Sequence, residues 1–288
     1  MNGRKLLLPL RRRWCWGGIS TVFDTMQKRS SWAIQKAVVF ALVLRELRTR
    51  ISMRNMGAFW LVFEPIGLVL VVVFERVFLR GINIQVGEMT YAMFIITGIV
   101  PHYMFKNIVL LGMGAIDANR NLFAYRQVKP LDCIVARTIM ECMLRVLGYT
   151  MLMFLMGFWL GYDISIARPL EWLSILFLGV LFSLSLSIIF CIWAEAMPNI
   201  KTIIRLAFMP VSFLSDFIIP ISKFPVQMQR WLSWNPFLQL NVKLRTAISP
   251  DYPALPGVDF KFVILITIIL LPISLMLYHS RRNKLVAI

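Results

Sequence analysis

Histidine, cysteine and acidic residues are scarce in this 288-residue chain, and each shortage argues against a class of chemistry. The sequence contains 2 histidines, 4 cysteines and 14 aspartates and glutamates, against 31 lysines and arginines. The cysteines form no CxxC pair, and neither an HExxH pair nor a GxSxG elbow occurs, so the sequence indicates no metal site and no hydrolytic nucleophile. The phosphate-binding loop GxxxxGK[ST] is also missing, so the chain lacks that route to ATP hydrolysis.

Apolar residues, in contrast, are abundant. They make up 59% of the sequence and the mean hydropathy is +0.72, whereas soluble domains contain roughly 45–50% apolar residues. The excess predicts that part of the protein is solvated by lipid. The formal net charge of +17 would suit a nucleic-acid partner, but most basic residues flank apolar runs, as cytoplasmic lysines and arginines do beside membrane spans. We therefore expect a protein that contacts membrane lipids and binds no nucleic acid.

Six apolar runs approach the roughly 20 residues that a helix needs to cross the hydrocarbon of a bilayer. The fifth run is the shortest and contains Pro210. The predicted spans are residues 57–79, 91–115, 133–160, 170–194, 203–219 and 260–278. An even number of spans puts the basic amino-terminal region and the basic carboxyl terminus on the same side. The sequence thus predicts an all-α polytopic membrane protein with both termini in the cytoplasm.

Two stretches outside the spans have distinctive patterns. Residues 31–56 place apolar and basic positions at helical spacing, which predicts an amphipathic helix in the membrane interface, with a plain cytoplasmic flank as the alternative. Residues 220–259 are rich in proline yet carry large apolar side chains, which favours short helices that re-enter the membrane between the fifth and sixth spans. Residues 1–30 are expected to form a loosely ordered cytoplasmic arm, residues 57–280 the transmembrane domain, and residues 281–288 a cytoplasmic tail.

Charged and aromatic side chains inside the predicted spans are candidates for function. Glu141 and Arg145 stand four residues apart in the order that favours an intrahelical pair, and a structural role is the stronger interpretation there. Glu64 lies inside the first span without an evident local partner. Aromatic faces near it would suit a passage for sugar rings, although packing or lipid contact explains their spacing better. The candidate glycan path comprises Phe59, Trp60, Phe63 and Glu64.

Several short segments, read in order, carry a family pattern. They are LRELRTR at 44–50, GAFW at 57–60, FEP at 63–65, TGIVP at 97–101, ANRNL at 118–122, YRQVKPLD at 125–132, and Asn235-Pro236 followed by Arg245. Together they resemble the ABC-2-type permeases, in the branch that exports capsular polysaccharide from Gram-negative bacteria. The resemblance extends over about residues 35–280.

The resemblance implies a homodimer of six-span subunits in the bacterial inner membrane. It also implies a dimer of a separate nucleotide-binding ATPase subunit, which would bind ATP and Mg, so that this chain needs no cofactor. The cargo would be a lipid-linked capsular polysaccharide, and a periplasmic polysaccharide co-polymerase or export adaptor would act with the complex. Cargo identity, lipid anchor and chain length do not follow from the sequence.

The resemblance also implies roles for individual residues. The interface helix would contain Arg45, Glu46, Arg48 and Arg50. Coupling to the ATPase would involve Asn119, Arg120, Asn121, Tyr125, Arg126, Lys129, Pro198 and Lys201. A periplasmic gate would involve Asp216, Trp231, Trp234, Asn235, Pro236 and Arg245.

Three positions depart from the family pattern. Gln239 and Val242 stand where family members often have histidine and glutamate, and Asp216 stands where a small residue is common. Two alternatives to capsule export therefore stay open. One is an ABC-2 permease for O-antigen, teichoic acid, a lipid or a drug. The other is an integral membrane glycosyl- or acyltransferase, which would be expected to cluster acids or histidines on one membrane face, and this sequence lacks such a cluster.

Overall fold

The computed structural model describes residues 30–52, 63, 66–67, 69–79, 81, 89–125, 127–197 and 199–286. The chain divides into two compact units, Met1–Ala37 and Val38–Ile288, and the boundary falls inside helix α2 (Ser31–Ser52). In the first unit, the Ser30 hydroxyl accepts a hydrogen bond from the Ala33 N–H at 3.3 Å, as a cap at the start of α2. The contacts discussed below all lie within the second unit.

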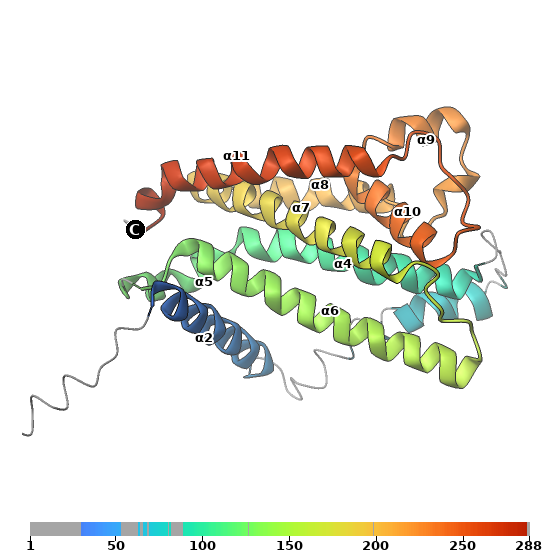
Figure 1. The fold of residues 1–288 in the computed structure, drawn as a ribbon, viewed down its shortest axis with the longest axis horizontal. Helices are drawn as coiled ribbons and strands as arrows, with labels where there is room; N and C mark the ends of the chain where they lie inside the picture. Colours follow the sequence, from blue (N-terminus) through green and yellow to red (C-terminus); the bar gives the residue numbers. More distant parts are fainter. Residues whose placement is uncertain are drawn as a thin grey trace, which may run out of the picture. The chain divides into compact units, whose positions relative to one another are not determined.

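Four long helices of the second unit are long and apolar enough to cross a membrane. They are α4 (Tyr91–Met113), α6 (Pro130–Leu160), α7 (Pro169–Ala196) and α11 (Phe260–Val286). Figure 1 shows them side by side, with α7 packed against both α4 and α11 and with α4 packed against α6. These four candidate spans coincide with the predicted second, third, fourth and sixth spans and agree with the prediction of a polytopic membrane protein.

Local sequence determines where these helices begin and end. Proline occupies the first position of both α6 and α7, where its missing N–H breaks no helical hydrogen bond. The backbone N–H of Lys129 donates to Asp132 Oδ2 at 3.1 Å and closes the start of α6. At the other end of α6, Gly161 has φ +68°, a left-handed conformation that favours glycine and terminates the helix.

The predicted first and fifth spans are less complete. Residues 66–67 and 69–73 are helical and continue into the π-helix η1 (Phe74–Leu79), but most of 57–65 lies outside the described residues. Helix α8 (Ile200–Phe213) has 14 residues, or about 21 Å at 1.5 Å per residue, against about 30 Å of hydrocarbon. It ends six residues before the predicted boundary because Asp216 takes a φ of +57°. Six spans therefore stay a prediction.

Short helices connect the long ones. The connection between α4 and α6 contains α5 (Ala115–Asn119) and η2 (Arg120–Ala124). Between α8 and α11 lie η3 (Ile221–Lys223), α9 (Val226–Leu232) and α10 (Pro236–Ile248). The prolines separate these last elements as the sequence predicted, and the Asn235 side-chain oxygen caps α10 by accepting from the Phe237 N–H at 3.0 Å. Their position relative to a membrane stays a prediction.

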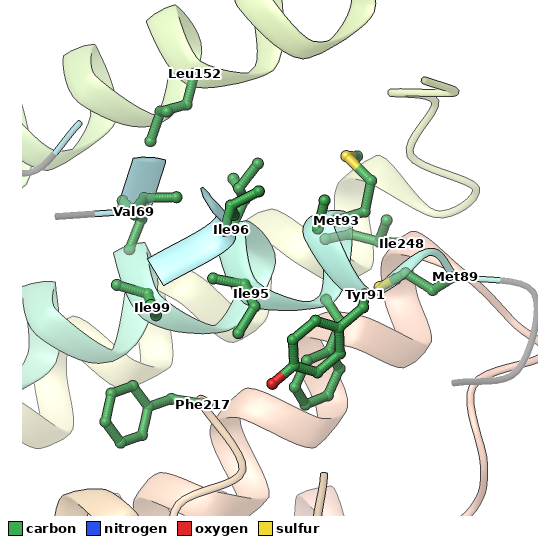
Figure 2. Packing of buried hydrophobic residues seen from close by; sticks show 14 of the residues in the cluster. Val69, Met89, Tyr91, Met93, Ile95, Ile96, Ile99, Leu152, Phe217 and Ile248 are labelled. Carbon is green, nitrogen blue, oxygen red and sulfur yellow. The ribbon is translucent and has the colours of Figure 1, made fainter. Parts of the chain in front are cut away.

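Helix α4 is central to the packing. Nearly every residue in its first half is buried, which is the pattern of a helix surrounded by protein. Its buried side chains belong to an apolar cluster that also contains residues of other elements. Figure 2 shows Ile96 of α4 in this cluster, with Leu152 of α6 and Phe217 from the connection after α8. The Tyr91 hydroxyl donates to the Ile218 carbonyl at 3.1 Å, so the one polar group on this aromatic is satisfied.

Small residues allow α4 and α7 to approach closely. A Cβ atom at Gly112 of α4 would overlap the Ser187 hydroxyl of α7 and lie 3.0 Å from the Ser187 Cβ atom. A Cβ atom at Gly179 of α7 would likewise press into the buried Phe105 ring of α4. Because lipid provides no hydrophobic force between helices, such close backbone packing is a main source of their association.

Gly112→Ala should therefore destabilise the protein by about 1–2 kcal/mol, net of the gain in helix propensity, because the methyl group overpacks the α4–α7 contact. Gly114→Ala is the matched control, since the nearest atom to its Cβ would be the Leu111 carbonyl oxygen at 3.8 Å. Unfolding of the purified protein in mixed detergent measures both. Equal unfolding midpoints for the two variants would contradict the packing assignment.

Candidate coupling and gating sites

At one end of the described bundle, ion pairs hold the segment between α4 and α6, residues 115–129, which we call the connecting segment (Figure 1). Asp117 of α5 pairs with Lys201 of α8, and Arg120 Nη2 of η2 lies 3.1 Å from Glu195 Oε1 of α7. Asn119 is buried, and its side-chain oxygen accepts a hydrogen bond from Arg45 of α2 at 2.8 Å. The connecting segment is thus tied to α2, α7 and α8.

The other side of the connecting segment faces outward. Tyr125 is 67% exposed, so its ring is available for contact with a partner. Three other predicted coupling residues of this segment are also exposed, namely Arg120, Asn121 and Lys129. Lys201 is half-buried through its pair with Asp117. Arg126 and Pro198 lie outside the described residues.

A ladder of alternating charges joins α2 to α6. Glu46 Oε1 of α2 lies 3.3 Å from Arg137 Nε, and Arg50 Nη1 lies 2.5 Å from Glu141 Oε1. Within α2, Arg50 Nε also lies 3.7 Å from Glu46 Oε1. We call these four residues the α2–α6 ladder. Of the residues predicted for the interface helix, Glu46 and Arg50 make these contacts. Arg45 instead bonds Asn119 of the connecting segment, and Arg48 is exposed.

Glu141 is the buried member of the ladder, with 2% of its side chain exposed. Its Oε2 atom accepts a hydrogen bond from Asn107 of α4 at 3.3 Å and lies 3.7 Å from Arg145 Nε. The predicted pair with Arg145 is therefore present, but the nearer cation is Arg50. An unpaired carboxylate at this burial would be costly, so the charge fixes α2 on α6.

The other end of the bundle contains a buried arginine. The side chains of Arg245 (α10) and Asp216 are both 0% exposed, and Arg245 Nη1 lies 2.5 Å from Asp216 Oδ2. Arg245 Nη2 donates to the Phe94 carbonyl at 2.8 Å, and its Cζ atom lies 3.6 Å from the centroid of the Phe94 ring. The Tyr252 hydroxyl donates to Asp216 Oδ2 at 2.6 Å. We call Phe94, Asp216, Arg245 and Tyr252 the Arg245 cluster.

The backbone accommodates this cluster. Gly98 of α4 leaves room for the guanidinium group, since a Cβ atom there would overlap Arg245 Nη2. Asp216 Oδ1 accepts the Ile221 N–H at 2.8 Å, so the same carboxylate fixes the loop that follows α8. Burial raises the pKa of Tyr252, which keeps its hydroxyl protonated as a donor.

A layer of amides lies beside the cluster. Asn235 Nδ2 donates to the Ser215 hydroxyl at 2.9 Å, and Asn241 Nδ2 donates to the Ser215 carbonyl at 2.7 Å. His102 Nδ1 lies 3.3 Å from the Asn241 amide, and the His102 ring stacks on Phe217 with centroids 4.7 Å apart. His102 is thus a buried packing residue.

The residues that depart from the family pattern have structural roles here. Gln239 Nε2 donates to the Ser233 carbonyl at 2.6 Å, and its Oε1 accepts the Asp259 N–H at 3.3 Å, so it joins the turn before α10 to the start of α11. Val242 is buried in the apolar cluster around α4. Asp216 supplies the counter-charge for Arg245.

The predicted gate residues therefore divide into two groups. Asp216 and Arg245 are in direct contact, and Asn235 lies beside them as the cap of α10, which Pro236 begins. Trp231 and Trp234 are instead exposed at the surface of the α9 region. Of the candidate glycan path, Phe63 is described and exposed, while Phe59, Trp60 and Glu64 lie outside the described residues.

Sequence reasoning missed several members of these sites. Asp117 and Glu195 pair with the predicted Lys201 and Arg120, and Arg137 pairs with Glu46. Tyr252 completes the Arg245 cluster through its bond to Asp216. It lies in a proline-rich stretch without a periodic pattern, so the sequence did not single it out. The scarcity of acidic residues could have pointed to these ion pairs. Basic residues outnumber acidic ones, so each aspartate or glutamate near a membrane end has several lysines or arginines with which it could pair.

The chain is similar to known proteins over most of its length. The family model described as "ABC-2 type transporter" matches residues 37–245. Polysialic acid transport protein KpsM of Escherichia coli is 30% identical over 260 residues, which cover 89% of this chain and 98% of that protein. The capsule polysaccharide export inner-membrane protein CtrC of Neisseria meningitidis serogroup A is 30% identical over 227 residues, 77% of this chain and 82% of that protein. BexB of Haemophilus influenzae, with the same description, is 27% identical over 221 residues, 75% and 80% of the two chains.

Asp216→Ala should destabilise the protein by about 3–5 kcal/mol, because it leaves the Arg245 guanidinium buried without a counter-charge. The double variant Asp216→Asn/Arg245→Met should recover most of that loss, since no charge is then buried and asparagine tolerates the left-handed backbone at this position. Glu171→Ala is the control: Glu171 forms an exposed pair with Arg168 at 3.3 Å, and its loss should cost less than about 1 kcal/mol. Detergent unfolding measures all three, and a harmless Asp216→Ala would contradict the assignment.

Proposed function

Because the chain belongs to the ABC-2 type transporter family, we propose that it is the membrane permease of a capsular polysaccharide exporter. Its relatives are named as polysialic acid transport and capsule polysaccharide export inner-membrane proteins. The cargo is a lipid-linked polysaccharide, which moves from the cytoplasm to the periplasm. The observation that carries the proposal is the similarity to KpsM over nearly the whole of that protein.

A separate nucleotide-binding subunit, in two copies, supplies the energy and binds ATP and Mg. The sequence lacks the phosphate-binding loop, so this chain needs such a partner. The permease is a homodimer with both termini in the cytoplasm, and the connecting segment faces the ATPase. A periplasmic export adaptor receives the polysaccharide. Six spans and the re-entrant helices near α9 complete the fold of each subunit.

The connecting segment transmits the motion of the ATPase. The exposed Tyr125 side chain is its point of contact with the partner, while Asp117, Asn119 and Arg120 anchor it to three helices. Rigid helices joined by buried or half-buried ion pairs move together, so a push on this segment reaches α2, α7 and α8 at once. The first and fifth spans shift in response, and the glycan advances.

The Arg245 cluster holds the periplasmic gate. It fixes the loop after α8 to both α4 and α10 through one carboxylate and one guanidinium. Opening a path at this end requires that the loop or α10 move, and breaking the pair is costly in a low-dielectric site. The gate therefore stays closed until the partner's motion is transmitted along the bundle.

Tyr125→Ala/Arg126→Ala should leave the permease folded but uncouple ATP hydrolysis from export. Phe177→Ala is the control, because Phe177 is 65% exposed, close to the 67% of Tyr125, yet lies on α7 in neither candidate site. The measurement is copurification of the ATPase with the permease from membranes, together with ATP turnover in lipid nanodiscs and surface capsule. A wild-type preparation with no nucleotide-binding partner would contradict the proposal and favour a membrane enzyme.

A charge exchange tests the anchor of the connecting segment. Asp117→Lys and Lys201→Asp should each reduce export, because each places two like charges side by side at the α5–α8 contact. The double exchange Asp117→Lys/Lys201→Asp should restore export toward the wild-type level. Capsule at the cell surface is the readout, and a double variant as defective as the single ones would contradict the anchoring role.

A further inference from the structure

An elongated cavity of about 300 Å³ lies among α4, α6 and α7, apart from both sites described above. Its lining on α4 runs from Met93 to Met104, a separation of about 16 Å along the helix axis. Its walls are mostly apolar, and the connection between α6 and α7 contributes Ile164 and Ile166. Val146 of α6 lines it and is 54% exposed, so the cavity opens at the surface of a predicted membrane span.

Two residues that line this apolar cavity carry a buried polar atom without a hydrogen-bond partner among the described residues. The two atoms are the Tyr149 hydroxyl and Trp172 Nε1, while Arg145, which also lines the cavity, has its Nε in a 3.7 Å ion pair with Glu141 and in no hydrogen bond. Arg145 and Tyr149 are one turn apart on α6, and the Tyr149 ring stacks on Trp172 of α7 with centroids 5.6 Å apart. Buried polar groups are normally satisfied, so two unsatisfied ones beside one cavity, next to an arginine, indicate a missing ligand.

The chemistry of these atoms restricts the ligand. Arginine and tryptophan side chains are donors only, and tyrosine donates readily, so the ligand must supply acceptor oxygens. The apolar walls exclude a glycan, whose hydroxyl groups would lose hydrogen bonds to water there. A neighbouring transmembrane helix also fits poorly, because its backbone carbonyls are already bonded within the helix.

We propose that this cavity binds one membrane glycerophospholipid. Its acyl chain lies along the apolar groove toward Met93 and Met153, its ester carbonyl accepts from Tyr149 and Trp172, and its phosphate faces Arg145. The lipid enters sideways from the bilayer at Val146. Arg145 already lies 3.7 Å from Glu141 of the α2–α6 ladder, so the bound phosphate adds a second anion to this arginine. The proposal goes beyond the export function and does not depend on the cargo.

The test uses the full-length protein purified in mild detergent, without ATPase or glycan, so its failure is distinct from failure of the export proposal. Native mass spectrometry should find one phospholipid retained per chain. Met153→Trp fills the groove and should abolish retention. Met151→Trp is the matched control, because Met151 lies on the exposed side of the same helix and outside the cavity lining. No lipid on the wild type, or equal retention in Met153→Trp, would overturn the proposal.

Tyr149→Phe removes only the hydroxyl, so it tests the polar contact without filling or emptying the groove. Its Kd for dioleoyl phosphatidylglycerol, added back to delipidated protein, should rise roughly threefold to tenfold with loss of one hydrogen bond. Dioleoylglycerol, which lacks the phosphate, should bind the wild type more weakly than the phospholipid. An unchanged Kd in Tyr149→Phe, or equal binding of the two lipids, would overturn the assigned head-group contacts.

Discussion

A charge buried in a low-dielectric interior needs an opposite charge from within the protein, and this constraint ties the described helices together. Glu141 of α6 is neutralised by Arg50, which is 91 positions away in α2. Arg245 of α10 is neutralised by Asp216, which is 29 positions away. The hydrophobic effect does not select one arrangement of apolar helices in lipid, because lipid tails are as apolar as the side chains. Each buried pair instead specifies one arrangement, since a shift of either helix would leave a charge unpaired.

The two groups of charges contact α4 at positions far apart along the helix. Phe94, near the first turn of α4, accepts from Arg245 and carries the guanidinium on its ring. Asn107, four turns further on, donates to Glu141, and the connecting segment follows directly after Met113. Helix α4 is buried and packs closely on α7 through Gly112, so we propose that a displacement at the connecting segment is carried along the helix. This is the physical basis for the proposed coupling between an ATPase at one end and a gate at the other.

The sequence predicted the four long apolar helices well, because hydropathy over a span of this length is a strong signal. The short helices after α8 were predicted from prolines and large apolar residues, and Asn235 and Pro236 act as the cap and first residue of α10. Contacts between distant residues were not predictable in the same way. A periodic pattern identified Glu141 and Arg145 as neighbours, but no pattern relates Arg50 to Glu141 or Tyr252 to Asp216. The left-handed conformation of Asp216 after α8 was also not predicted, since aspartate adopts it more often than most residues but still only occasionally.

The central claim is that this chain moves a finished polysaccharide and does not make it. Deleting its gene in the native host and measuring polysaccharide separately inside the cells and on their surface tests that claim most directly. The account predicts that the polymer is still synthesised and accumulates in the cytoplasm while the surface loses it. Loss of the polymer from both compartments, or an unchanged surface capsule, would contradict it.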